Sequence, residues 1–223
     1  MNYEQVRARL LEAVEARLLK PDGAQSSFLE LASAAGVSVP TLRHYFGTHE
    51  ALLSEVMSDL RRKSLPYLYS GAVEDHGDVR QSLKWMLEQF ARSWPLYTGP
   101  SHAFCLAAGI GHESLGPTYV RELLEPTLQA IETRLARHMA QGELRQSELR
   151  GATLALFGPL MLALLHQHQL GGARERSMDL QAFIQQHLEG FLRAYGATPK
   201  QPEPRTPPAA GTEPRRRGRK AAR

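Results

Sequence analysis

The chain has 223 residues, 42% of them hydrophobic, which is enough to bury a core. Its single cysteine, Cys105, excludes an intrachain disulfide framework and suits a reducing compartment. The formal net charge of +4 is uneven: residues 196–223 hold eight Lys or Arg against two Glu, whereas the first 47 residues hold five of each sign. The opening residues lack the apolar segment of a signal peptide, so we expect a cytoplasmic protein.

Two helices are predicted before residue 36. Apolar residues recur at every fourth position and predict an amphipathic helix over residues 3–19, which the sequence KPDG then ends. Ser27 and Glu30 have the spacing of a capping box for a second helix, in which each side chain accepts a hydrogen bond from the other residue's backbone N–H. Gly36 follows that helix, where a residue that tolerates positive φ is expected to end it.

A third and a fourth helix follow closely. Ser38 is the expected N-cap of the third, Pro40 falls in its first turn, and Phe46 lies at its end. Phe46 is expected in the core and the neighbouring Tyr45 partly exposed. Glu50 begins the fourth helix, which we expect to reach about residue 63. Its predicted inner face comprises Leu52, Leu53, Val56 and Leu60.

The remainder of the chain also has helical periodicity, and no segment alternates with a period of two. Further helices are predicted near 78–94, 101–112, 117–141, 149–169 and 177–195, separated by proline, glycine or polar breaks. The 15-residue apolar stretch 151–165 is shorter than the roughly 20 residues of a membrane span, so it predicts a buried helix and no membrane partner. We therefore predict an all-α protein.

The residues from 26 to 53 carry the functional signal. Two short helices joined by a tight glycine-containing turn form a helix-turn-helix, whose second helix can enter the DNA major groove. This stretch resembles the signature of the TetR family of transcriptional regulators. The resemblance is carried by Leu31-Ala32, Ala35-Gly36-Val37-Ser38, Thr41-Leu42, His44-Tyr45-Phe46 and Glu50-Ala51-Leu52-Leu53.

The resemblance implies a three-part chain. It comprises a DNA-binding head over residues 1–47, a helical effector-binding and dimerisation domain over 48–195, and a Pro/Arg-rich tail over 196–223 that we expect to be disordered. It also implies a homodimer, made mainly through the helices at 149–169 and 177–195, on a palindromic operator of double-stranded DNA.

The resemblance also implies roles for individual residues of the third helix. Thr41 and Tyr45 match positions that touch phosphates, and Arg43 is the best candidate for reading a base, since arginine pairs in bidentate fashion with guanine. Val39 and His49 replace residues that are often basic in the family. The complete set of predicted DNA contacts is Ser27, Ser38, Val39, Pro40, Thr41, Arg43, His44, Tyr45 and His49.

An effector pocket is expected among the middle helices, because aromatic and flexible side chains with a few polar anchors are typical of small-molecule sites. The identity of the effector is left open, and many of these side chains could equally be plain core. The candidates are Trp85, Met86, Phe90, Trp94, His102, Phe104 and Tyr119, with His112 as a further possible anchor.

The tail carries a basic stretch that resembles the core of an AT-hook. Its candidate DNA contacts are Arg215, Arg216, Arg217, Arg219 and Lys220. One hypothesis is that the tail supplies the phosphate attraction that the neutral head lacks; the alternative is an unselected, solvated tail.

Other functional classes have less support. An architectural DNA-binding protein would rest on the tail alone. No phosphate loop, nucleophile elbow or metal-binding HExxH sequence is present. His166 and His168 are two residues apart, which places them on different faces of a helix. We therefore predict no enzymatic activity, no cofactor and no metal. The family resemblance implies a ligand-responsive regulator, and the choice of repressor over activator rests on family frequency alone.

Overall fold

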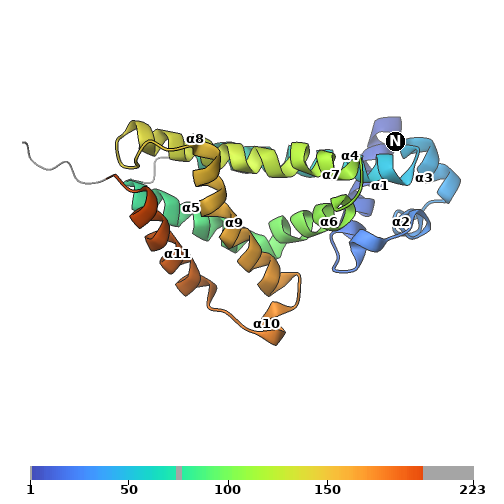
Figure 1. Ribbon diagram of the computed structural model, residues 1–223. Helices are drawn as coiled ribbons and strands as arrows, with labels where there is room; N and C mark the ends of the chain where they lie inside the picture. The colour runs from blue at the N-terminus through green and yellow to red at the C-terminus, as the bar shows by residue number, and fades with distance from the viewer. Residues whose placement is uncertain (1, 74–76, 198–223) are drawn as a thin grey trace, which may run out of the picture.

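The computed structural model describes residues 2–73 and 77–197, and for residues 68–73 only the backbone. Within these residues every regular element is helical, which confirms the predicted all-α fold. Figure 1 shows an elongated molecule in which α1, α2 and α3 form a head at one end, and the remaining helices form a body that extends away from it.

The head consists of three helices and a short 3-10 turn: α1 (Tyr3–Leu18), η1 (Gly23–Gln25), α2 (Phe28–Ala34) and α3 (Val39–Phe46). The predicted capping box is confirmed, because the Ser27 hydroxyl accepts from the Glu30 N–H while Glu30 accepts from the Ser27 N–H at 2.7 Å. Ser38 caps α3 as predicted, accepting from the Thr41 N–H at 3.2 Å. These caps fix where each short helix begins.

The turn between α2 and α3 depends on Gly36, whose φ is +68° and whose absent Cβ faces open space. Because the space is open, a substitution there is disfavoured only by the left-handed backbone. Gly36→Ala is expected to lower the free energy of unfolding by about 1–2 kcal/mol, measured by urea denaturation. Gly36→Asn should lose less, since asparagine tolerates this conformation; equal stability of the alanine variant and the wild type would contradict the expectation.

The body contains α4 (His49–Val73), α5 (Val79–Ser93), α6 (Gly99–Gly109), α7 (Leu115–Tyr119), α8 (Glu125–Ala140), α9 (Leu149–His168), α10 (Gly172–Glu175) and α11 (Leu180–Tyr195). The inner face predicted for α4 is confirmed: Leu52, Leu53, Val56 and Leu60 are all buried.

Two predicted helix boundaries were wrong. The fourth helix continues past residue 63 to Val73. The break expected between residues 94 and 101 is instead a π-helical turn, η2 (Trp94–Thr98), which joins α5 to α6. Proline and glycine in this stretch suggested a stop, but packed helices can absorb an extra residue as a π-turn without ending. A second π-turn, η3 (Val120–Leu124), lies within the helix predicted over 117–141 and joins α7 to α8.

The core is divided into two clusters. One is centred in the head, on Leu10, Val14 and Leu42, and the other lies in the body between α5, α8, α9 and α11. The head cluster extends into the body, because it includes side chains of α6, α7 and η3: Phe104, Cys105, Leu115, Tyr119 and Leu123. The head is therefore packed firmly against the near end of the body, and a displacement of α6 or α4 reaches the head directly.

Helix α9 belongs to the body core. Among the described residues it is the one helix that is long and apolar enough to cross a membrane. Its residues Leu156, Leu160 and Leu164 are fully buried against α8 and α11, as in the core helix of a helical bundle. The burial agrees with the prediction of a packed helix.

Candidate DNA-binding surface and effector cavity

Helix α3 presents a polar face to the outside of the head. Ser38, Pro40, Arg43 and His44 are exposed and Thr41 is half-buried, while Leu42 on the opposite face is fully buried. As predicted, Phe46 is in the core and Tyr45 is partly exposed. The face that would enter a groove is thus held on a rigid base and is not folded inward.

Aromatic contacts support α3 from both sides. Tyr3 at the start of α1 stacks on Tyr45 with ring centroids 4.8 Å apart, and also meets His44 edge-on at 6.3 Å. The Arg43 guanidinium lies 5.8 Å from the centre of the Phe28 ring in α2. This cation–π contact favours one position of an otherwise flexible arginine. Sequence reasoning missed Tyr3, because an aromatic residue at a helix start carries no pattern of its own.

Two of the predicted DNA contacts face the protein. Val39 is half-buried against the head core. The His49 ring meets Phe28 at 5.9 Å, its Nε2 atom is enclosed, and burial lowers its pKa below the ordinary value. Val39 and His49 therefore help to build the surface. The other predicted contacts of this segment, which remain at least partly exposed, are Ser38, Pro40, Thr41, Arg43, His44 and Tyr45. Ser27 is exposed at the N-terminus of α2.

The body contains a partly open cavity of about 610 Å³ between α4, α5, η2, α6, η3, α8 and α9. Its walls are mainly apolar, with Trp85, Met86 and Phe90 on α5 facing Ile131 of α8 and Phe157 of α9. A mainly apolar chamber of this size with a few polar groups has the character of a small-molecule site.

The structure divides the seven predicted pocket residues. Trp85, Met86, Phe90 and His102 line the cavity, whereas Trp94, Phe104 and Tyr119 do not. Trp94 is fully buried, and its ring stacks on that of His102 with the ring centroids 5.7 Å apart. The Nε1 atom of Trp94 donates to the side chain of Gln169 at 2.6 Å. Phe104 and Tyr119 are drawn into the head cluster, since α6 and α7 close the junction between head and body. His112 lies outside the cavity and accepts from the N–H of Ser114 at 3.4 Å.

His102 is a fully buried polar group in the cavity wall. Its Nδ1 atom pairs with the Tyr119 hydroxyl at 2.9 Å, so the ring is held in one orientation. Burial lowers the pKa of His102 from 6.5 to about 4, because the imidazolium loses its hydration. The cavity therefore presents a neutral imidazole at physiological pH.

The depressed pKa predicts a dependence of stability on pH. Between pH 6.5 and about 4, His102 is protonated in the unfolded chain but neutral in the folded chain. The free energy of unfolding is therefore highest above pH 6.5 and falls as the pH is lowered through this range. The full loss is about 3 kcal/mol. Urea unfolding across this range should show a shallower decline for His102→Asn than for the wild type; parallel pH profiles would contradict a neutral buried His102.

Two cationic residues and a tyrosine of the cavity wall were not among the predicted pocket residues. Lys63 of α4, Tyr97 of η2 and Arg134 of α8 all line it. Arg134 is 1% exposed, and its guanidinium lies 5.4 Å from the centre of the Trp85 ring. Lys63 was predicted only as the approximate end of the fourth helix, whereas α4 continues to Val73 and Lys63 lies within it.

A serine, a histidine and a glutamate also come together in the body. The Ser82 hydroxyl lies 2.9 Å from His138 Nε2, His138 Nδ1 lies 2.6 Å from Glu143, and Arg134 donates to the same hydroxyl at 2.7 Å. Ser82 is fully buried and does not line the cavity, so no substrate can reach it. The arrangement satisfies buried polar groups between α5 and α8, which is a structural role.

Three further features of the sequence analysis are the basic tail, possible metal ligands and the single cysteine. The tail residues Arg215, Arg216, Arg217, Arg219 and Lys220 lie outside the described residues. Over the described part of the chain no three His, Cys, Asp or Glu side chains gather as metal ligands. Cys105 is fully buried, and burial raises the pKa of its thiol, which agrees with a packing role.

A sequence comparison addresses the head directly. Residues 16–56 match the family model of the bacterial regulatory proteins of the tetR family, which spans the end of α1, α2, α3 and the start of α4. A search of curated proteins finds no match. The head is thus a helix-turn-helix DNA-binding domain, and the chain is a DNA-binding regulator. Its head carries the helix-turn-helix domain that is described by the TetR family model, as the sequence resemblance implied.

Solved structures extend the likeness to the body at the level of fold. A Mesorhizobium loti protein assigned to the TetR family is 18% identical, with 88% of this chain and all of that chain covered and a TM-score of 0.71. PfmR from Thermus thermophilus is 23% identical over 84% of this chain and 95% of its own, with a TM-score of 0.61. FadR from Bacillus subtilis, solved in complex with stearoyl-CoA, is 17% identical, with 85% of this chain and 97% of that chain covered and a TM-score of 0.60.

Proposed function

We propose that this regulator is a ligand-responsive repressor that binds a palindromic operator as a homodimer. The observation that carries the proposal is the cavity, whose wall includes Leu60, Lys63 and Ser64 of α4. The same helix begins three residues after α3 ends and packs against α1. A ligand in the cavity therefore touches the helix that positions the recognition surface, and can favour one placement of the heads over another.

The character of the cavity favours an effector with a large apolar part. Aromatic and aliphatic side chains form most of the wall, and the related fold of Bacillus subtilis FadR was solved with stearoyl-CoA, a molecule with a long acyl chain. We therefore infer that apolar-chain compounds are the first class to test.

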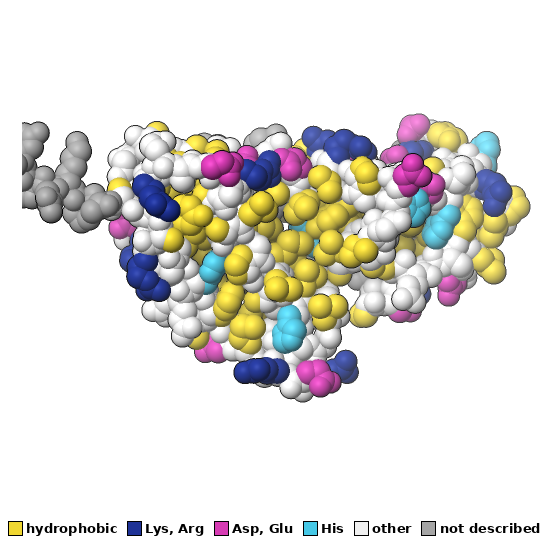
Figure 2. Space-filling model, viewed as in Figure 1, with side chains coloured by type: hydrophobic (Ala, Val, Ile, Leu, Met, Phe, Trp, Pro, Cys, Tyr) yellow, Lys and Arg dark blue, Asp and Glu magenta, His cyan; other side chains and the backbone are white. Residues whose placement is uncertain are grey.

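A homodimer is supported by the outer face of α9. Leu154 is 49% and Leu162 is 65% exposed, and Gly158 lies between them on the same face with open space around its absent side chain. Figure 2 shows hydrophobic side chains gathered over α9 at the centre of this view of the molecule. Two copies of such a face, meeting about a two-fold axis with α11 alongside, would form a four-helix bundle.

The test is selection of bound fragments from a genomic library, followed by footprinting of the selected DNA. A repressor of the proposed kind protects one or a few palindromes, and an effector then changes the affinity for them. An architectural DNA-binding protein, the alternative that the basic tail suggests, would coat DNA broadly without preference for a sequence. Broad, sequence-independent protection would overturn the proposed function.

A further inference from the structure

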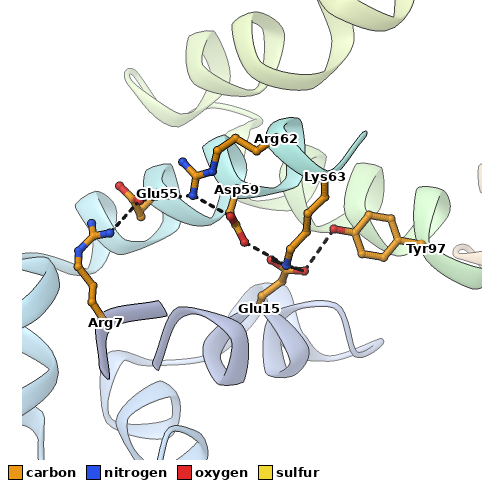
Figure 3. Close-up of polar contacts among 7 residues, drawn as sticks. All are labelled: Arg7, Glu15, Glu55, Asp59, Arg62, Lys63 and Tyr97. Carbon is orange, nitrogen blue, oxygen red and sulfur yellow. Dashed lines mark hydrogen bonds and ion pairs between the residues drawn. The ribbon is translucent and has the colours of Figure 1, made fainter. Parts of the chain in front are cut away.

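Glu15 is a buried carboxylate on the body side of the head. It belongs to α1, is 5% exposed, and accepts from Lys63 Nζ at both oxygens, at 2.8 and 2.7 Å. The Tyr97 hydroxyl donates to the same carboxylate at 3.2 Å (Figure 3). Burial raises the pKa of Glu15 and Lys63 opposes that rise, so the charged carboxylate is held in place by these two donors.

Both donors also belong to the wall of the cavity. Lys63 comes from α4 and Tyr97 from η2, and both residues line the cavity while their polar atoms point to Glu15 (Figure 3). Glu15 therefore lies behind the part of the wall that these two residues form. A group that reached this part of the wall would meet the same ammonium and hydroxyl that hold the head.

The contact is the last member of a row of charges between α1 and α4. Lys63 also binds Asp59 at 3.0 Å, Arg62 binds Asp59 at 2.7 Å, and Arg7 of α1 binds Glu55 of α4 at 3.3 Å (Figure 3). Arg7 and Glu15 thus form ion pairs that connect both halves of α1 to α4, the helix that follows the recognition helix. Of these two ion pairs, only the one between Glu15 and Lys63 includes a residue that lines the cavity.

The charge of the wall selects what can enter. Among the described residues that line the cavity none is acidic, whereas Lys63 and Arg134 are cationic. The rest of the lining is uncharged and mainly apolar, and it includes Leu60, Phe90 and Leu123. An anionic group would meet donors such as Lys63, and an apolar chain attached to it would fill the rest.

We propose that the effector is an amphipathic carboxylate whose carboxylate group replaces Glu15 at Lys63 and Tyr97, and thereby releases α1 from the cavity wall. This inference rests on the proposed function, because it names the ligand class and the regulation of the same cavity.

The exchange is balanced in hydrogen bonds. Lys63 and Tyr97 keep a carboxylate partner throughout, so no buried donor is left unsatisfied, and the released Glu15 is hydrated as α1 moves. The apolar chain of the ligand then supplies the driving force, since its burial has no counterpart in the empty state. By linkage, weakening the hold of Glu15 must strengthen ligand binding to the same extent.

The first experiment compares dodecanoate with methyl dodecanoate, which has the same chain and no charge. Quenching of tryptophan fluorescence reports binding, because Trp85 lines the cavity. Amide hydrogen exchange in residues 3–18 reports release of α1. Dodecanoate should bind at least tenfold more tightly than the ester and should accelerate exchange in α1. Equal binding of acid and ester, no binding of dodecanoate, or unchanged exchange would overturn the inference.

The second experiment uses a matched pair of substitutions on the same row of charges. Glu15→Gln keeps the shape but removes the competing charge, so it should raise the affinity for dodecanoate about tenfold and leave that for the ester unchanged. Glu55→Gln alters the row away from the cavity and should change neither. A Glu15→Gln variant with unaltered affinity for dodecanoate, or with an equal gain for the ester, would contradict the exchange.

These measurements need no DNA, so the two proposals can fail separately. Selective operator binding without a response to dodecanoate would remove only the ligand assignment. Carboxylate-dependent release of α1 without selective operator binding would remove only the role as repressor.

Discussion

Leu154→Glu/Leu162→Glu is expected to convert the protein to a monomer and to weaken operator binding by about 10²–10⁴-fold. The two leucines are exposed on α9 and flank Gly158, so each dimer would gain four carboxylates on the face that is proposed as the dimer interface. In a dimer, binding of one head to the operator raises the effective concentration of the second head at the other half-site. A monomer lacks this gain, which is of the same size as the expected loss of affinity.

Light scattering after size-exclusion chromatography measures the mass, and titration of the selected operator measures affinity. Leu96→Glu is the matched control, because Leu96 is 82% exposed on η2 and lies on neither α9 nor α11. It should remain dimeric and bind normally. An unchanged helical circular dichroism spectrum of the double variant excludes simple unfolding. A double variant that stays dimeric would place the interface on another surface.

The head could be predicted closely from the sequence because its signals are local. Capping pairs such as Ser27 with Glu30, and a glycine such as Gly36 where φ is positive, act within a few residues of one another. Their chemistry fixes the ends of short helices regardless of what packs against them. The exposed face of α3 followed from the same reasoning.

The cavity could be predicted only in part, because its wall is assembled from seven elements. Trp85 and Phe90 were found by residue type, but type alone cannot separate a wall residue from one behind it, as with Trp94 and Phe104. Lys63 and Tyr97 were missed for another reason. Lys63 lies on a helix whose predicted end was that same residue, and Tyr97 lies in the π-turn of η2, which has no local signature in the sequence.

The same difficulty concealed the contacts of Glu15. A glutamate in the middle of an amphipathic helix reads as a solvent-facing charge, and its partners Lys63 and Tyr97 are 48 and 82 residues away. Nothing in the spacing of the sequence relates them. Long-range ion pairs of this kind are specified by the packing of whole helices.

Arg43→Ala is expected to remove the sequence preference of the head at one base-pair position of each half-site. Arg43 is the single Lys or Arg between Pro21 and Leu60, is exposed on α3, and is steadied by the Phe28 ring. If it pairs with a guanine in the major groove, its loss costs about 1–3 kcal/mol at each half-site. That loss should be concentrated at one base-pair position, because the other bases are read by other side chains.

The measurement is operator affinity against a set of singly substituted operators, at several salt concentrations. Arg43→Lys is the matched control, since lysine keeps the charge but lacks the planar fork that pairs with a base. A base-reading arginine predicts relaxed specificity at the same position for both variants, with the dependence of log K on log[salt] almost unchanged. A uniform loss on all sequences, with a slope flatter by about 0.9 per head, would instead make Arg43 a phosphate contact. The neutral head would then read DNA through Ser38, Thr41, His44 and Tyr45 alone.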